Sequence, residues 1–463
     1  MALTSIGATG THSLASMQRC WMDIYHDLGD PSYAHIAVPM LFPGQLDVGN
    51  LVESLRIVAD RHSVLRARYL RTESGGWAYV LDPDVHIVPR IISIGRSADD
   101  GDLLGSQIQT FIRERFDVYR APLFRVAILS GWPAYAAVLL VIHHSVFDAF
   151  SSSILTAELR AVYDARRRQI PLELPTLPLQ FSDYSHAQAN WLNSPKAQSH
   201  LEFWNRKLRG ARPVTKWPVV FAQAPHSPTI PKISITIERT QRLHRIGKRA
   251  GCSPFLILLS AFYLAIQKVA QVRGHVVWVF HSGRRQVETL NLIGCLFDEW
   301  PLRVDIADGM SLFDMVRAIR QSYIEALPHT EIPSATIWDV ATVTSDAQLS
   351  PEIFFNYRPV GICESFSTTD VGGGSEGIIK NLREFRLKHR MESNSQIDKA
   401  VGAVLGCHVT EHAGGIECDF ECDYQLLSRS LVARLLSQIN AEVLGIEAAL
   451  MGFPERGGGN DVD

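Results

Sequence analysis

Cysteines are few in this sequence, and they are not spaced for a disulfide framework or a metal site. The chain has 463 residues and seven cysteines. Cys418 and Cys422 lie close together, but no histidine or cysteine pair elsewhere completes a zinc set. We therefore expect reduced thiols, as in cytoplasmic proteins, and no bound metal.

Long apolar runs and an excess of one charge are also missing. The longest apolar segments, residues 255–266 and 136–142, are shorter than the roughly 20 residues that a membrane span needs. Residues 1–21 lack the basic start and apolar stretch of a secretory signal. Lysine and arginine number 45 against 48 acidic residues, which gives a net charge of -3. Because this balance provides no basic surface for nucleic acid or an anionic membrane, we expect a soluble cytoplasmic protein that binds neither.

Helical and strand patterns alternate along the chain, which is typical of an α/β fold. Residues 136–143 form a predicted strand that is apolar enough to be buried on both faces, and a helix is expected at 151–168. A stretch rich in proline and leucine, residues 171–179, breaks the pattern. Since 463 residues exceed one ordinary core, we expect two domains, residues 1–180 and 181–463.

Other predicted elements can be compared directly with a structure. They are a strand at 63–70, a strand at 77–81, a strand at 232–237, a helix at 312–326, and an apolar helix opened by Ser253 and Pro254 that runs to Ala270.

Two adjacent histidines at the end of the apolar strand carry the clearest chemical signal. His143 and His144 are followed by Asp148, four residues after the second histidine. Neighbouring side chains on a strand point to opposite faces, so the two histidines cannot share one role. An imidazole is suited to proton transfer or to orienting a nucleophile, because its pKa lies near neutrality. The alternative is that both histidines are core residues and that Asp148 only caps the next helix.

The motif and its surroundings resemble the condensation domains of nonribosomal peptide synthetases, within the chloramphenicol acetyltransferase-like superfamily. The family's His-His-x-x-x-Asp-Gly motif is matched from His143 to Asp148, with Ala149 in place of the glycine. Further matches follow in family order along about the whole chain: Arg19 and Trp21, the Arg-His-x-x-Leu-Arg passage at 61–66, Pro122-Leu123-Phe124-Arg125, Phe181-Ser182-Asp183-Tyr184, Gly283-Arg284, Ile293-Gly294 and Pro301-Leu302-Arg303.

The resemblance implies two chloramphenicol acetyltransferase-like lobes that meet in a V, with the motif in a central tunnel. A donor acyl or aminoacyl thioester, on the phosphopantetheine of an acyl or peptidyl carrier protein, would meet an amine or hydroxyl acceptor near His144. The product would be an amide or ester of natural-product or antibiotic biosynthesis. His144 would be the base or would position the nucleophile. We see no adenylation-like or carrier segment, so we expect a free-standing, monomeric acyltransferase that meets its carrier in trans and needs no cofactor of its own.

Other residues receive supporting roles from the same resemblance. Asp148 would face away from the substrate and pair, across the two lobes, with the arginine that matches Arg284. Ser151 is placed to cap the helix after the motif, and Tyr184 would lie along the tunnel. Ala149 allows fewer backbone angles than the family's glycine.

The family's neutral Asn-Thr pair is replaced by Asp298 and Glu299. One hypothesis is that at least one of these carboxylates faces the tunnel and favours a cationic or amine-bearing substrate. The other is that both lie on a solvated loop without a specific role.

Two alternative functions remain open on the sequence. One is a superfamily acyltransferase that uses acyl-coenzyme A. The other is an inactive relative that recruits a partner protein; the retained His143, His144 and Asp148 argue against it, while Ala149 and the divergent second half argue for it. An epimerising relative is disfavoured, because no Glu-Gly-His-Gly-Arg-Glu-like segment is present.

Overall fold

The computed structural model describes residues 10–28, 31–93, 100–130, 135–211, 231–307, 309–344, 353–359, 404–424 and 426–451. Contacts divide them into two compact units. The first holds the described residues of Met1–Gln198 and His281–Asp298, and the second those of Ser199–Phe280, Glu299–Val360 and Gly402–Asp463. This grouping differs from the single boundary predicted after residue 180, because the chain returns to the first unit at His281.

The first unit is built around a four-stranded sheet in the order β2-β7-β6-β5. Strands β2 (His35–Pro43), β7 (Tyr135–His143) and β6 (Phe124–Ser130) are antiparallel, and β5 (Arg90–Ser93) is parallel to β6. A smaller sheet joins β1 (His12–Ser13), β4 (Trp77–Leu81) and β3 (Ala67–Arg71). The register pairs His35 with His143, so β2 ends beside the histidine motif.

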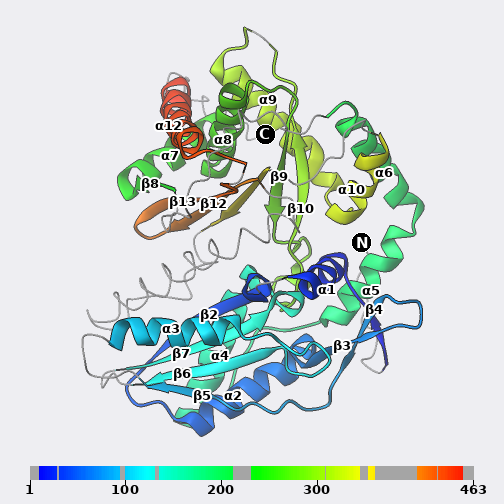
Figure 1. Cartoon of the computed structure of the whole chain (residues 1–463), viewed down its shortest axis with the longest axis vertical. Helices are drawn as coiled ribbons and strands as arrows, with labels where there is room; N and C mark the ends of the chain where they lie inside the picture. Colours follow the sequence, from blue (N-terminus) through cyan, green and yellow to red (C-terminus); the bar gives the residue numbers. More distant parts are fainter. Residues whose placement is uncertain are drawn as a thin grey trace, which may run out of the picture. The chain divides into compact units, whose positions relative to one another are not determined.

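Helices cover both faces of the four-stranded sheet in the first unit (Figure 1). Its helices are α1 (Ser16–Asp27), α2 (Val48–Arg61), α3 (Asp100–Arg113), α4 (Ala149–Arg168) and α5 (Phe181–Leu192), with short 3₁₀ turns η1 (Pro31–Ala34), η2 (Ser63–Arg66), η3 (His144–Val146) and η4 (Val287–Thr289).

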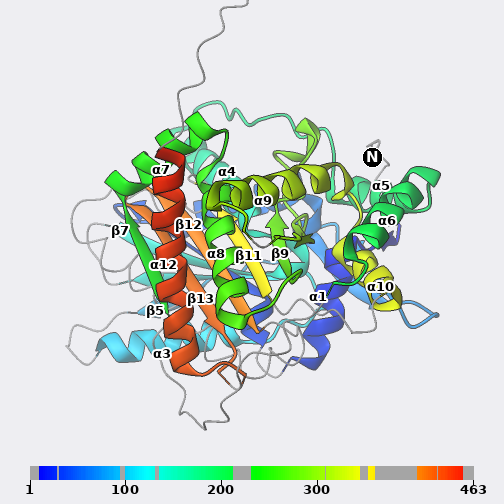
Figure 2. The same cartoon turned by 90° about the horizontal axis from the view of Figure 1, so that it is seen from above.

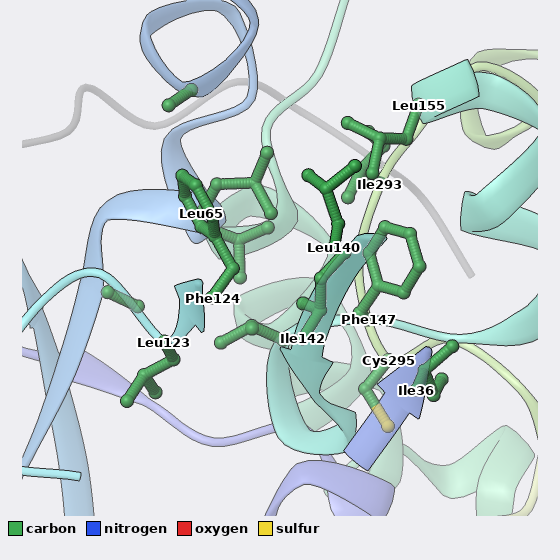
Figure 3. Packing of buried hydrophobic residues seen from close by; sticks show 14 of the residues in the cluster. Ile36, Leu65, Leu123, Phe124, Leu140, Ile142, Phe147, Leu155, Ile293 and Cys295 are labelled. Atoms are coloured by element: carbon green, nitrogen blue, oxygen red, sulfur yellow. The ribbon is translucent and has the colours of Figure 1, made fainter. Parts of the chain in front are cut away.

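Strand β7 is buried on both faces, as the sequence predicts. Ala137, Leu139 and Val141 pack in the cluster that contains Phe111 of α3. The alternate residues Val138, Leu140 and Ile142 pack in a second cluster with residues of α2 and α4. Figure 3 shows Leu140 and Ile142 among Phe147, Leu155, Ile293 and Cys295. The motif therefore follows a strand that is enclosed on both faces.

The second unit contains a six-stranded sheet in the order β10-β9-β11-β12-β13-β8. Its strands are β8 (Lys232–Thr236), β9 (Val276–His281), β10 (Asp298–Arg303), β11 (Ile353–Arg358), β12 (Leu405–His412) and β13 (Gly415–Cys422). Its helices are α6 (Pro195–Leu208), α7 (Ile237–Ala250), α8 (Pro254–Ala270), α9 (Leu312–Ala326), α10 (Ser334–Thr344) and α12 (Arg429–Met451), with the 3₁₀ turn η5 (Leu327–His329).

Helices α8, α9 and α12 lie over this sheet (Figure 2). Phe262 of α8 lies against Phe355 of β11 and Phe420 of β13, with ring centroids 5.6 Å and 6.4 Å apart. Among the described residues no single helix is long and apolar enough to span a membrane; α7 and α8, bent by 94°, pass that test only as a pair. Alternation of helices and strands in both units confirms the predicted α/β class.

Candidate active site

His143 ends strand β7 inside the first unit. It is fully buried, and the ring of Tyr25 lies edge to face with it at 4.3 Å between centroids. Burial lowers the pKa of His143 well below the usual 6.5, and the nearby His35, His144 and Arg125 lower it further. His143 is therefore neutral, and its side chain accepts a hydrogen bond from the backbone N–H of Ser145, which caps the turn η3.

His144 begins η3 and has different surroundings. It is partly exposed, while the residues on either side of it are buried. Its ring stacks on Trp21 of α1, with centroids 4.3 Å apart and planes at 13°, and Phe297 lies 4.8 Å away at 41°. The two histidines thus occupy separate environments, as expected, although the strand ends at His143 and it is the turn η3 that directs His144 elsewhere.

Asp148 and Arg284 form the predicted ion pair, with both side chains almost completely inaccessible. Nη1 and Nη2 of the guanidinium donate to the two carboxylate oxygens at 2.8 Å and 3.0 Å. Such a two-pronged contact is among the stronger charge-assisted hydrogen bonds. Since Arg284 belongs to the first unit by its contacts, the pair is internal to that unit, and the expectation that it joins the two lobes is wrong.

The Asp148 carboxylate also accepts hydrogen bonds from groups other than Arg284. Oδ1 accepts from the backbone N–H and the hydroxyl of Ser151, which fixes the first turn of α4. Oδ2 accepts from the backbone N–H groups of Leu296 and Phe297 at 3.1 Å and 3.2 Å. Asp148 therefore holds the segment that places the Phe297 ring beside His144.

Ser151 adds a second anchor for the same segment. Its hydroxyl oxygen lies 3.1 Å from both the backbone N and the backbone O of Gly294, and it accepts from Nη2 of Arg284 at 3.0 Å. A Cβ on Gly294 would lie 2.0 Å from the ring of Phe181, so only glycine allows this close approach. Ser151 lies inside the first turn of α4, whose N-cap is Asp148, so the expectation that Ser151 caps this helix is wrong. Its side chain instead belongs to a larger buried network.

Ala149 occupies the first position of α4, directly after its N-cap Asp148. Among the described residues, the non-glycine positions with positive φ are Gln169 and Gln271, so Ala149 adopts a backbone conformation open to any residue. The local geometry at this position does not require the family's glycine.

Asp298 and Glu299 lie in strand β10, so the hypothesis that both occupy a solvated loop is wrong. Asp298 is 7% exposed, while Glu299 is partly exposed and belongs to the second unit. Tyr184 is buried, and both burial and the charge of Asp298 raise the pKa of its hydroxyl. The expected tunnel positions of Asp298, Glu299 and Tyr184 stay predictions.

The structure brings His143, His144, Asp148, Ala149, Ser151 and Arg284 together in the first unit. It adds Trp21 and Phe297, whose rings contact His144 and to which sequence reasoning assigns no part in the site. Trp21 is visible in the sequence as part of a family motif, whereas Phe297 lies in a segment that diverges from the family's pattern. Within the described part of the chain, no group of three or more His, Cys, Asp or Glu residues is arranged to hold a metal ion.

Comparisons with known sequences point to one family. The family model for the Condensation domain matches residues 8–440. A linear gramicidin synthase of Brevibacillus parabrevis is 26% identical over 94% of this chain and 8% of that protein. Phosphinothricin tripeptide synthetase PhsB of Streptomyces viridochromogenes is 28% identical over 96% of this chain and 36% of that protein. The chain thus spans 8% and 36% of the lengths of these two relatives.

Solved structures show the same fold. The first condensation domain of the calcium-dependent antibiotic synthetase aligns with a TM-score of 0.70 at 15% identity, over 95% of this chain and 97% of that one. The epimerization domain from the third module of tyrocidine synthetase B aligns with a TM-score of 0.75 at 17% identity, over 97% and 99%. Since these two domains are named for different activities, the fold alone does not separate condensation from epimerisation.

Proposed function

The chain belongs to the condensation-domain family, and from this premise we propose that it transfers an acyl or aminoacyl group from a carrier-bound thioester to an amine or hydroxyl. The product is an amide or an ester. The proposal includes a carrier protein that acts in trans and delivers the thioester on its phosphopantetheine arm.

One observation carries this proposal: His144 is partly exposed, whereas the residues that support it, His143 and Asp148, are buried and hydrogen-bonded. His143 and Asp148 are enclosed and have structural partners, so neither is available to a substrate. His144 keeps access to solvent, and its ring contacts the rings of Trp21 and Phe297. Proton transfer and nucleophile orientation both require an imidazole that is fixed in orientation and accessible to the substrate.

The proposed reaction is an addition followed by an elimination. The acceptor nitrogen or oxygen attacks the thioester carbonyl, and a tetrahedral oxyanion forms. The carbon–sulfur bond then breaks, and the proton lost by the acceptor ends on the leaving thiol. His144 takes this proton from the acceptor or orients the acceptor for attack, which contributes roughly 10²–10⁴-fold when the geometry is correct. Holding both reactants together contributes further through proximity.

The relatives support the carrier as the donor's source, because they include a linear gramicidin synthase and a tripeptide synthetase. Two other functions give different experimental results. A coenzyme A-dependent acyltransferase would accept acyl-coenzyme A without a carrier, and an inactive domain that recruits a partner protein would transfer no acyl group.

The test compares donors that share one acyl group. A carrier protein primed with phosphopantetheine is loaded with alanyl, phenylalanyl or octanoyl groups, and the same groups are offered as coenzyme A thioesters. Each donor is incubated with the chain and a panel of amines and alcohols, and products are measured by mass spectrometry. We expect product from a carrier-bound donor, loss of product in His144→Ala, and unchanged product in the control His86→Ala, which changes an exposed histidine. Product from coenzyme A donors alone would contradict the carrier, and no product from any donor would contradict acyl transfer.

A further inference from the structure

The hydroxyl of Ser145 lies in the turn that carries His144. Ser145 is fully buried, and its Oγ is 2.6 Å from Nδ1 of His143. The backbone N–H of Ser145 donates to the same Nδ1 at 3.2 Å. A backbone N–H can only donate, so Nδ1 is the acceptor and carries no hydrogen. The serine hydroxyl must therefore also donate to Nδ1.

This arrangement fixes the tautomer of His143. With Nδ1 accepting, the ring hydrogen sits on Nε2, which has no hydrogen-bond partner among the described residues. Aromatic rings surround His143: Tyr25 at 4.3 Å and Phe116 at 6.0 Å between centroids. The orientation of the His143 ring thus depends on the two hydrogen bonds at Nδ1, and the shorter one comes from the Ser145 hydroxyl.

The backbone of Ser145 is linked by hydrogen bonds, through Tyr69, to helix α1, which also contacts His144. Its carbonyl oxygen accepts from the hydroxyl of Tyr69 at 3.3 Å, and Nε2 of Gln18 donates to that hydroxyl at 3.0 Å. Gln18 lies in α1, where its Oε1 accepts from the backbone N–H of Ala15 at 3.1 Å. Helix α1 also carries Trp21, on which His144 stacks. Ser145 thus forms hydrogen bonds with His143 and, through Tyr69 and Gln18, is linked to helix α1.

We propose that Ser145 is a positioning residue, whose hydroxyl holds His143 as the Nε2–H tautomer and thereby keeps the His144 ring stacked on Trp21. Its role in turnover rests on the proposed acyl transfer by His144. Its effect on the two rings does not, because the geometry of this turn exists without substrate.

The test uses two variants of equal shape. Ser145→Thr keeps the hydroxyl and Ser145→Val replaces it with a methyl group, so any packing cost of the added carbon is common to both. We expect the kcat of Ser145→Val to be about tenfold below that of Ser145→Thr, because a His144 ring that is less well positioned stabilises the transition state less. KM should be similar in the two variants, whereas the urea midpoint of Ser145→Val should lie below that of Ser145→Thr, because the buried Nδ1 of His143 loses its shorter hydrogen bond. A purely structural role would lower stability and leave kcat per folded molecule equal.

Nuclear magnetic resonance of the full chain, labelled with ¹⁵N in histidine, gives a second reading without substrate. The His143 and His144 signals are identified by their loss in His143→Asn and His144→Ala. We expect His143 as the Nε2–H tautomer, and an upfield ring shift of His144 caused by Trp21, in the native chain and in Ser145→Thr. In Ser145→Val the His144 shift should move toward that of an exposed histidine.

The outcomes separate the two proposals. An Nδ1–H tautomer of His143, or equal His144 shifts and equal kcat in Ser145→Thr and Ser145→Val, would overturn the positioning role and leave acyl transfer intact. A native chain that shows the expected tautomer and ring shift but transfers no acyl group would refute the proposed function and, with it, the part of Ser145 in turnover.

Discussion

Removal of the Arg284 guanidinium should destabilise the first unit strongly. Arg284→Met keeps most of the side-chain length and removes the charge that faces Asp148. The carboxylate would remain almost completely buried without its counter-ion, and the carbonyls of Ser282 and Leu292 would lose a donor. Breaking one partner of such a pair typically costs about 3–5 kcal/mol, and we expect a loss of this size in the free energy of unfolding.

Asp148→Asn tests the other side of the pair. Oδ1 accepts from the N–H and hydroxyl of Ser151 and from Arg284, and Oδ2 accepts from Arg284, Leu296 and Phe297. Whichever of the two oxygens is replaced by the amide NH₂ group, the three groups that donated to that oxygen lose their acceptor. We therefore again expect a loss of about 3–5 kcal/mol in the free energy of unfolding. The double variant should lose less than the sum, by a coupling of about 0.5–3 kcal/mol.

The assay is urea unfolding followed by circular dichroism and tryptophan fluorescence. The matched control is Arg56→Met, which removes an arginine from the exposed pairs with Glu53 and Asp60 on α2 and should change stability by less than about 1 kcal/mol. A cost for Arg284→Met as small as that of the control, or strict additivity in the double variant, would refute the reasoning.

Three further predictions concern other described residues. Burial lowers the pKa of His35 to about 3 and that of His143 well below 6.5, so the unfolded chain binds more protons than the folded chain at acid pH. The free energy of unfolding should therefore fall as pH drops below about 6.5, by about 1.4 kcal/mol per histidine at pH 5.5. Urea unfolding at pH 7.5 and pH 5.5 measures this difference. Ala149→Gly should lower the free energy of unfolding by up to about 1 kcal/mol without raising kcat, and a large gain in kcat would contradict the relaxed helical position of Ala149. Asp298→Asn combined with Glu299→Gln should raise KM for basic acceptors only, and an equal change for neutral acceptors would dismiss a charge effect.

Elements with strong local signals could be predicted from the sequence. The helix Pro254–Ala270 has the predicted ends, because the Ser253 hydroxyl accepts from the backbone N–H of Leu256 and Pro254 fits the first turn. The strand Trp77–Leu81 and the helix Leu312–Ala326 also have the predicted bounds.

Helices and strands whose apolar residues are interrupted by charged residues were harder to predict. The expected strand at 63–70 begins as the 3₁₀ turn η2, since Leu65 donates its N–H to the carbonyl of His62. The sequence pattern did not predict helix α7, because its buried apolar residues, such as Leu243 and Ile246, are separated by many charged residues. The expected strand at 232–237 ends one residue earlier, at Thr236, which is the N-cap of α7. In both places a short hydrogen-bonded turn or cap decides the structure.

The candidate site could be predicted in part. Local periodicity places His143 and His144 at the end of a strand, but the partner of Asp148 lies 136 residues away, and only the family resemblance indicated Arg284. The contacts of His144 with Trp21 and Phe297, and the hydrogen bond from Ser145 to His143, depend on tertiary packing that no spacing in the sequence records.

The central claim is that His144 serves acyl transfer while the residues around it hold it in place. Its most direct test is the turnover of native chain, His144→Ala and His143→Ala with saturating carrier-bound donor and acceptor, measured beside the urea midpoint of each. We expect His144→Ala to lose at least about 10²-fold in rate with an almost unchanged midpoint, and His143→Ala to lose both rate and stability. A His144→Ala chain that keeps most of the native rate would contradict the account.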